Sequence, residues 1–442
     1  MKTKLLFLFL LVLVTNTNLF SQVTTNIFEQ VLFYDGYASL VNEPTPPGVT
    51  RFRNDLISRK LTETELANFG NTLTVNVSIT AACDNYDRIG NVNLALVPKN
   101  QATYVPGSVS RIELARFITP FMNYNYAPDT VPYTFNVDNM AKIFKDPTII
   151  AAYDIWIELQ LFGVPYAANT QVQGCAGRND VFYGTLDFVS NTTAVTANEV
   201  LIPLNFQNYL NNYQAGASDA VGQTTRTISF NVQNNLTDAN LYLITSNHGA
   251  NSGGEEYNRR WHYIDFDGTQ IASYRPGELT CEPYRVYNTQ GNGIYGSTPR
   301  TNAQWQSFSN WCPGSIIPIR ILSLGNVVGG THVFKIRVPN AVFANGEGYF
   351  PVSLYLQGTN TVLNTNQYSK VDYYLSPNPT SNIITVNTND TLENLSVIDI
   401  MGKEIWSGTN KTIDMSNFQK GIYILKIKFE NFEVLTEKII KN

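Results

Sequence analysis

The chain has 442 residues, of which 15% are charged, and its formal net charge is −5 at pH 7. This mild negative charge, without a basic stripe, argues against a nucleic-acid partner. The chain is rich in Asn, Thr and Tyr and contains 29 Gly and 20 Pro. That composition is typical of exported all-β proteins, in which short strands are joined by turns.

Residues 1–22 predict a secretory signal peptide. Lys2 and Lys4 precede an unbroken apolar run from Leu5 to Val14, and the segment from Leu19 to Gln22 offers a cleavage region. The apolar run is too short for a permanent transmembrane helix, and no later segment is long and apolar enough. We therefore expect a soluble, exported protein without a membrane span.

The first domain is expected over residues 23–187. Apolar residues alternate with polar ones from Leu73 to Ile79, from Val92 to Leu96 and from Tyr153 to Leu161, which predicts half-buried strands. In the third of these strands Glu158 falls on the face opposite to the apolar residues.

A short helix is expected within Asn54–Asn68, because Thr62 and Glu65 have the spacing of a capping box. Residues 188–198 contain Asn191 followed by two threonines, which break the strand pattern. We expect this segment to be a linker.

The second domain is expected over residues 199–358. Its predicted strands are Thr227–Val232, Leu241–Thr245, Trp261–Phe266, Ile316–Ile321, Val333–Val338 and Val352–Leu356. Two domains of this size can each bury an adequate core.

The stretch from Ile244 to Gly268 gathers chemically active side chains between two of these strands. It holds His248, His262, the adjacent pair Glu255 and Glu256, two arginines and several aromatic residues. Loops on a rigid β scaffold often carry binding groups, and this mixture suits a polar, ring-shaped ligand such as a sugar. The alternative is a solvated hairpin with surface charges, and Glu255 itself is expected to be solvated.

The four cysteines, an even number in an oxidising compartment, are expected to form disulfides. Three connectivities are possible from the sequence alone. Free thiols are the alternative.

Five segments together resemble the bacterial peptide-N-glycosidase F amidases. They are CDNYDRIGNV (83–92), ARFITPF (115–121), the strand around Glu158, GGEEYNRRWHYI (253–264) and NWCPGSIIPIRI (310–321). They occur in the family's order over about residues 70–325. The resemblance implies two adjacent antiparallel jelly-roll β-sandwiches with an active cleft at their interface. It also implies that the protein uses neither a metal nor a cofactor.

The resemblance also implies the activity. The expected reaction is hydrolysis of the bond between asparagine and N-acetylglucosamine in N-linked glycoproteins or glycopeptides, which leaves aspartate and releases the glycan. The family's catalytic acids fall on Asp87, Glu256 and Glu158. We expect Asp87 to act as the principal acid and base, Glu256 to hold the water, and Glu158 to position the first sugar. Arg88 would steady a carboxylate or the oxyanion; a surface ion pair between Asp87 and Arg88 is the alternative.

The expected substrate-binding wall departs from the family pattern. Tyr86 and Tyr257 stand where the family has tryptophan, Gln160 replaces another tryptophan, and Phe308 replaces an arginine just before the WCPG motif that contains Trp311. These changes leave a second hypothesis open, in which the protein is a catalytically altered glycan-binding protein of the same fold.

Other chemistries fit the sequence less well. Copper monooxygenases share the two-jelly-roll architecture but need several His ligands and a Met, and three separated histidines do not supply two copper sites. No GxSxG nucleophile elbow is present, and no cysteine lies in a thiol-hydrolase motif. His262 lies on a predicted strand, where a core or hydrogen-bonded role is expected.

The family pattern pairs Cys281 with Cys312. Cys83 and Cys175 are then left for each other, because the family bonds the Cys83 position to a nearby cysteine that this chain lacks.

Residues 359–372 are expected to be a polar linker, and residues 373–442 resemble the C-terminal sorting domain of the type IX secretion system, a small β-sandwich. The resemblance rests on SPNPT (376–380), MGK (401–403) and GIYILK (421–426). A carbohydrate-binding or adhesion module is the alternative. We expect a monomer, secreted or attached to the cell surface, whose partners are N-glycosylated proteins or glycopeptides and the type IX machinery.

Overall fold

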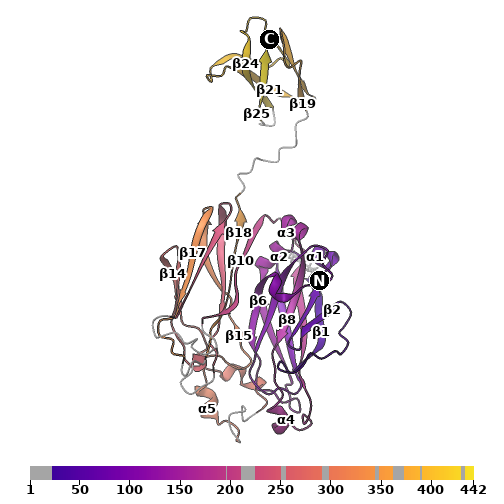
Figure 1. The fold of residues 1–442 in the computed structure, drawn as a ribbon, viewed down its shortest axis with the longest axis vertical. Coiled ribbons are helices and arrows are strands. Elements are labelled where there is room, and N and C mark those ends of the chain that lie inside the picture. Colours follow the sequence, from indigo (N-terminus) through magenta and orange to yellow (C-terminus); the bar gives the residue numbers. More distant parts are fainter. Residues whose placement is uncertain are drawn as a thin grey trace, which may run out of the picture. The chain divides into compact units, whose positions relative to one another are not determined.

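The structure is a computed structural model that describes residues 22–195, 197–210, 224–249, 255–290, 298–343, 348–361, 373–388, 391–429 and 434–442. The chain divides into two compact units, Met1–Thr361 and Val362–Asn442 (Figure 1). Strands dominate both units, and every pairing between named strands is antiparallel. The prediction of an all-β protein built from sandwiches is confirmed.

The first sandwich joins a four-stranded sheet, in the order β1-β9-β4-β7, to a six-stranded sheet, in the order β15-β6-β5-β8-β3-β2. Every second residue of β4 is buried, as its alternating pattern predicts, and these side chains share one core with apolar residues of β5 and β8. The strands are β1 (Gln22–Tyr34), β2 (Val49–Arg53), β3 (Leu56–Lys60), β4 (Leu73–Ala81), β5 (Ile89–Pro98), β6 (Ser110–Ile118), β7 (Thr130–Asn136), β8 (Tyr153–Leu161), β9 (Asp180–Asn191) and, from later in the chain, β15 (Ile316–Ile317).

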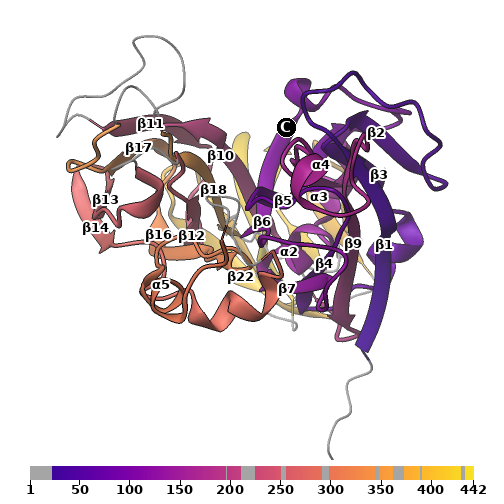
Figure 2. The same cartoon turned by 90° about the horizontal axis from the view of Figure 1, so that it is seen from below.

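The second sandwich has two four-stranded sheets, in the orders β10-β18-β12-β16 and β11-β17-β13-β14. Its core is separate from that of the first sandwich and includes Leu241, Phe334 and Leu354. Figure 2 shows the two sandwiches side by side, the first mostly in indigo and purple and the second in rose and orange. The strands are β10 (Glu199–Tyr209), β11 (Thr225–Val232), β12 (Leu236–Thr245), β13 (His262–Phe266), β14 (Thr269–Tyr274), β16 (Arg320–Val327), β17 (Gly330–Arg337) and β18 (Pro351–Asn360).

A buried arginine joins the two sandwiches. Arg116 on β6 donates hydrogen bonds of 2.8 Å to Ser246 Oγ and to the Pro351 carbonyl, both in the second sandwich. Its charge is balanced by a bidentate pair with Glu113, at 2.7 and 2.6 Å. Removing either partner would leave a buried charge unpaired, so this pair fixes the interface.

The helices are short. Helix α1 begins with the expected capping box: Thr62 Oγ1 accepts a hydrogen bond from the Glu65 amide, and the Glu65 carboxylate accepts one from the Thr62 amide. The described helices are α1 (Glu63–Asn68), α2 (Asp138–Ile143), α3 (Pro147–Ala152), α4 (Ala168–Gln171) and α5 (Asn302–Ser307), with 3₁₀ turns η1 (Pro106–Ser108), η2 (Glu255–Tyr257) and η3 (Glu282–Tyr287).

The smaller unit is a third sandwich, with sheets in the orders β19-β20-β23 and β22-β21-β24-β25. Val386, Val397 and Leu425 lie in its fully buried core. The predicted GIYILK strand begins β24, and the MGK turn connects β21 to β22 with Gly402 at a φ of +86°. The strands are β19 (Tyr373–Ser376), β20 (Ile383–Thr388), β21 (Leu392–Ile398), β22 (Glu404–Gly408), β23 (Thr412–Asp414), β24 (Gly421–Phe429) and β25 (Val434–Lys441).

One predicted strand is wrong in an informative way. Ile316–Ile321 was expected to be continuous, but it divides into β15 and the start of β16, and these belong to different sandwiches. Pro318 lies at the break and has no N–H to donate to a ladder, so the chain changes sheet there.

The expected boundaries also shift. Strand β9 continues to Asn191, which pairs with Gln22, so the expected linker 188–198 starts later than its sequence suggests. Gln22, the expected end of the signal peptide, begins β1, and residues 1–21 lie outside the described residues. Strand β18 extends to Asn360, and residues 362–372 of the expected second linker are likewise outside them.

Candidate active site

A cavity of about 730 Å³ is lined by both sandwiches. This volume falls within the range of roughly 300–1,000 Å³ that is usual for small-molecule sites. Its lining residues are Tyr37, Tyr86, Asp87, Arg88, Ile89, Asn91, Arg116, Ile118, Gln160, Phe162 and Tyr166 from the first sandwich, and Gln207, Tyr209, His248, Gly249, Glu256, Trp311, Tyr349 and Pro351 from the second.

The turn between β4 and β5 carries Asp87 into this cavity. Buried Asp84 holds the turn, because its carboxylate accepts hydrogen bonds from the amides of Tyr86 (2.6 Å) and Val164 (2.8 Å). Arg88 Nε donates to the same carboxylate at 3.2 Å. The alternative of an ion pair between Asp87 and Arg88 is therefore wrong, because the partner of Arg88 is Asp84.

The surroundings of Asp87 change its acidity. Burial, and next to it the charge of Glu256, raise the pKa of Asp87 from 3.8 to about 7, although the Arg88 guanidinium acts in the opposite direction. A carboxyl group with a pKa near neutrality can both accept and donate a proton in the physiological range.

The second carboxylate comes from the η2 turn. The Gly249 amide donates a 2.9 Å hydrogen bond to Glu256 Oε2, which fixes this side chain against the wall of the second sandwich. The neighbouring Glu255 was expected to be solvated, and that expectation is wrong. Glu255 is fully buried, where it forms a bidentate pair with Arg260 at 2.9 and 3.0 Å and accepts a bond from the Val342 amide.

The third expected acid, Glu158, does not line the cavity. Its fully buried carboxylate accepts hydrogen bonds from Arg111 (2.9 Å), Tyr104 (2.8 Å) and Asn93 (3.1 Å). The Asn93 amide also donates to Asn91, which does line the cavity, at 2.9 Å. Glu158 therefore lies behind the wall and is connected to it through two asparagines.

Some of the expected substrate-binding residues line the cavity, and others do not. Gln160, two residues along β8 from Glu158, lines the cavity and donates a 2.9 Å hydrogen bond to Asp55. Trp311 also lines it, and the buried indole N–H of Trp311 has no hydrogen-bond partner among the described residues.

Phe308 does not belong to the cavity lining. Its ring lies 6.1 Å from the Trp305 ring, and the Arg300 guanidinium is 4.6 Å from its centroid. The substitution at this position therefore packs against its own helix and not along the described wall. The side chain of Tyr257 lies outside the described part of the structure.

His248 lines the cavity, although no role was predicted for it. His248 Nε2 lies 2.7 Å from Ser246 Oγ, which also accepts from Arg116, and burial together with Arg116 holds the His248 pKa well below its usual value. The signal in the sequence was the position of His248 in the charge-rich loop that follows β12. His262, by contrast, is a core residue as expected: burial lowers its pKa to about 4 and its Nδ1 lies 3.0 Å from the Arg260 carbonyl.

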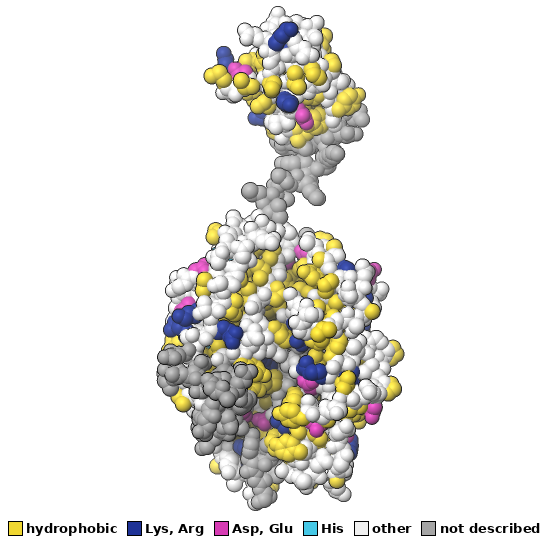
Figure 3. All heavy atoms as spheres, in the orientation of Figure 1, with side chains coloured by type: hydrophobic (Ala, Val, Ile, Leu, Met, Phe, Trp, Pro, Cys, Tyr) yellow, Lys and Arg dark blue, Asp and Glu magenta, His cyan; other side chains and the backbone are white. Residues whose placement is uncertain are grey.

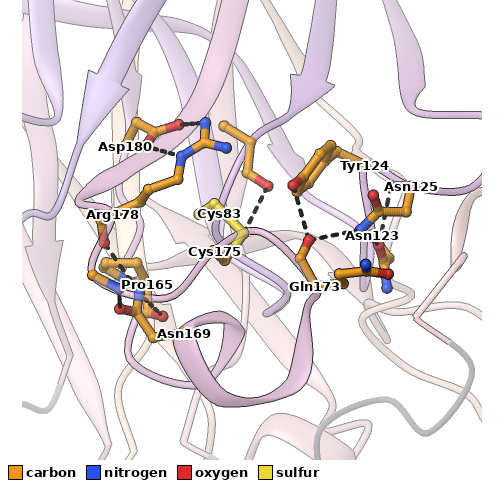
Figure 4. The surroundings of a disulfide bond; sticks show 12 residues. Cys83, Asn123, Tyr124, Asn125, Pro165, Asn169, Gln173, Cys175, Arg178 and Asp180 are labelled. Atoms are coloured by element: carbon orange, nitrogen blue, oxygen red, sulfur yellow. Dashed lines mark hydrogen bonds and ion pairs between the residues drawn. A yellow bond between two sulfur atoms is a disulfide. The ribbon is translucent and has the colours of Figure 1, made fainter.

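A disulfide ties the Asp87 turn to the loop that follows β8. Cys83 is bonded to Cys175 (Figure 4). Asn85 Nδ2 donates a 3.1 Å hydrogen bond to Gln171 of the same loop. Cys281 is bonded to Cys312, which adjoins Trp311. Both pairs are those expected, and each fixes a segment that contributes to the cavity.

Across the described ranges, no group of three or more His, Cys, Asp or Glu side chains is arranged to hold a metal ion. No described helix is long and apolar enough to cross a membrane. On the face of the larger unit shown in Figure 3, basic and acidic side chains are scattered between polar and hydrophobic ones. The chemically distinctive groups are therefore the two carboxylates that face one cavity from opposite sandwiches.

Three parts of the chain match protein-family models. Residues 24–176 match the family model described as "Peptide-N-glycosidase F, N terminal", and residues 216–357 match "Peptide-N-glycosidase F, C terminal". Residues 374–442 match "Secretion system C-terminal sorting domain". A comparison with curated proteins gives no significant match.

Solved structures give the same architecture. A structure of PNGF-II is 19% identical, with a TM-score of 0.57 over 78% of this chain, and the chain spans 66% of the length of that protein. PNGase F, a glycosylasparaginase from Flavobacterium meningosepticum, is 15% identical, with a TM-score of 0.50 over 77% of this chain and 97% of the other. At these identities the structures establish a shared fold.

Proposed function

This chain belongs to the peptide-N-glycosidase F family, and we propose that it is a secreted amidase that hydrolyses the bond between asparagine and N-acetylglucosamine in N-linked glycoproteins or glycopeptides. The products are a peptide with aspartate in place of asparagine and the released glycan. The observation that carries this proposal is the pair of carboxylates facing one cavity, Asp87 with a pKa of about 7 and Glu256 opposite it.

The chemistry follows from these two groups. Glu256, fixed by the Gly249 amide, orients a water molecule whose oxygen attacks the carbonyl carbon of the substrate amide. Asp87 accepts a proton from that water and returns it to the leaving nitrogen as the C–N bond breaks. The peptide keeps the new oxygen as a carboxylate, and the sugar leaves as its amine. Burial, and next to it the charge of Glu256, keep the Asp87 pKa high enough for both steps.

The remaining expected residues support this centre. Trp311 lines the cavity, and its ring would contact the substrate. Tyr86, Tyr257 and Gln160 would contact the substrate, and Arg88 positions Tyr86 by lying 4.3 Å from its ring centroid. Glu158 acts as a positioning residue, because it orders the two asparagines that lead to the wall.

The C-terminal sorting domain supports export. We propose that residues 1–22 direct the chain across the inner membrane and that residues 373–442 are read by the type IX secretion machinery. The enzyme would then act on glycoproteins outside the cell, where both disulfides are stable.

A fluorescent N-glycopeptide, incubated with the full chain and followed by mass spectrometry, tests the activity. We expect a deglycosylated peptide that contains aspartate.

The glycan-binding alternative rests on Gln160, since Phe308 lies away from the described wall. Retention of the intact glycopeptide on the protein, without product, would favour that alternative and overturn the proposed amidase.

A further inference from the structure

Four aromatic rings and one arginine pack in a row along one wall of the cavity. The Arg88 guanidinium lies between two rings, 4.3 Å from the Tyr86 centroid and 5.8 Å from that of Phe162. At one end of the row Tyr37 packs edge-on against Phe162 with centroids 5.2 Å apart, and at the other end Tyr166 packs against Tyr86 at 5.4 Å. All five residues line the cavity and come from the first sandwich. We call this row the aromatic wall.

The two ends of the aromatic wall are exposed. Tyr37 is 80% exposed and Tyr166 is 61% exposed, although each packs against a more buried ring. Exposed aromatic residues at the edge of a cavity mark ligand-binding surfaces more often than isolated surface rings do. Both exposed rings belong to the lining of the cavity that the two carboxylates face.

The loop that carries Tyr166 is held in place. The disulfide between Cys83 and Cys175 fixes its far end (Figure 4). Asn169 Nδ2 donates to the Pro165 carbonyl (2.9 Å) and to the Arg178 carbonyl (3.0 Å), which closes the loop next to Tyr166. The position of the exposed ring is therefore set before any ligand binds, so little ordering cost opposes stacking on it.

The chemistry of the wall favours a sugar over a peptide. An extended peptide is usually recognised by free main-chain groups, but here the amides of Gly36, Tyr37 and Val164 already donate to the Gly163 carbonyl, Asp35 and Asp84. What remains are flat ring faces and phenol groups. Such a surface suits a pyranose ring, which has an apolar C–H face and polar hydroxyl edges.

We propose that Tyr37 and Tyr166, one at each end of the aromatic wall, form an extended stacking subsite for glycan rings beyond the sugar that is bonded to asparagine, an inference that rests on the proposed amidase function. The subsite would recognise the extended part of the N-glycan. The Cys83–Cys175 bond would act as a positioning element for the Tyr166 half.

The test compares three substrates that share one peptide and carry a single N-acetylglucosamine, two N-acetylglucosamines, or a mannose-containing core pentasaccharide. Tyr37→Ala and Tyr166→Ala should each lower kcat/KM on the pentasaccharide substrate by roughly three- to tenfold, mainly through KM. On the single-sugar substrate both variants should stay within about twofold of wild type. Tyr126→Ala is the matched control, since Tyr126 is 60% exposed but does not line the cavity.

Gly36→Ala provides a second route to the same surface. A methyl group added there would collide with the Phe162 ring, on which Tyr37 packs, so the wall should move while both tyrosines remain. Its kcat/KM should fall on the pentasaccharide substrate in the same way. No effect of any of the three variants, or an equal fall on all three substrates, would overturn the subsite. A fourth substrate carries the single N-acetylglucosamine on a longer peptide; a fall on this substrate as large as that on the pentasaccharide substrate would assign the wall to the peptide and also overturn the subsite.

Failure of the amidase proposal can be told apart from failure of the subsite. If wild type cleaves none of the substrates, the amidase is wrong, and the free core pentasaccharide is titrated into the same proteins by calorimetry. Weaker binding to Tyr37→Ala and Tyr166→Ala than to Tyr126→Ala would support the subsite even then. Equal binding by all variants, or no binding by wild type, would overturn it.

Discussion

Replacing Asp87 with asparagine should stabilise the protein while it removes the proposed chemistry. The folded-state pKa of Asp87 is raised from 3.8 to about 7, first by burial and then by the charge of Glu256. For a raised pKa, the stability associated with this carboxyl is fully present below the unfolded value and is lost as pH rises through about 7. Above that pH the folded protein holds a carboxylate that the unfolded chain would solvate better.

The size of the effect follows from the same shift. A pKa rise from 3.8 to about 7 corresponds to an upper bound of roughly 4 kcal/mol, at about 1.4 kcal/mol per pH unit. The Asp87 side chain keeps partial contact with solvent, which screens its interactions, so we expect about 2 kcal/mol. Asp87→Asn should therefore be as stable as wild type near pH 4, more stable at pH 5.5, and most stable, by about 2 kcal/mol, at pH 8.

Urea unfolding at these three pH values, followed by tryptophan fluorescence, measures the difference. Four of the five tryptophans belong to the larger unit, so the signal reports mainly on the sandwiches that form the site. Exposed Asp129 does not line the cavity, and Asp129→Asn is the control. The reasoning is refuted if Asp87→Asn gains no stability at pH 8, or if its gain is the same at all three pH values.

Other expected outcomes test separate features. Glu256→Gln should lower kcat and also lower the pKa that Asp87 shows in a pH profile of residual kcat/KM, because a negative charge that helps to raise this pKa is removed; an unmoved pKa would contradict the pairing. Replacing Cys83 and Cys175 by serine should lower the free energy of unfolding by up to about 4–5 kcal/mol, since the bond spans 92 residues, and an unchanged urea midpoint would count against it. His332→Gln should be less stable than wild type near pH 5.5 but not near pH 8.5. Burial lowers the His332 pKa, but hydrogen bonds to an aspartate and a carbonyl outweigh burial and raise this pKa above 6.5. The contribution of His332 to stability is therefore present below pH 6.5 and is lost as pH rises through the folded-state pKa. A deficit in that variant that does not change with pH would refute this reasoning. Chelators should leave amidase activity unchanged, because the proposed steps use carboxylates; activity lost in EDTA and restored by one metal would oppose this.

Local patterns predicted where many strands lie, because apolar residues alternate along them, but β5 and β8, which were expected to be half-buried, are buried on both faces. The alternating run Tyr153–Leu161 coincides with β8, and the Thr62–Glu65 capping box lies where its spacing placed it. Long-range choices are not visible in such patterns. The sequence around Pro318 reads as one strand, but only the packing of two sandwiches determines that its halves join different sheets.

The candidate site shows the same division. The structure brings Asp87 and Glu256 to one cavity, as the motifs that carry them imply. Alternation places Glu158 on the polar face of β8, yet it does not reveal that Arg111 occupies that carboxylate. Glu255 and Glu256 are adjacent in sequence, and only the geometry of the η2 turn sends the first into the interior and the second into the cavity.

Isotope incorporation tests the central claim most directly. The full chain is incubated with an N-glycopeptide in water enriched in oxygen-18, and the peptide product is analysed by mass spectrometry. Hydrolysis of the side-chain amide predicts aspartate that carries one heavy oxygen in its new carboxylate, and no such product from Asp87→Asn. A peptide that keeps asparagine, with the heavy oxygen found on the released sugar, or an unchanged glycopeptide, would contradict the amidase assignment.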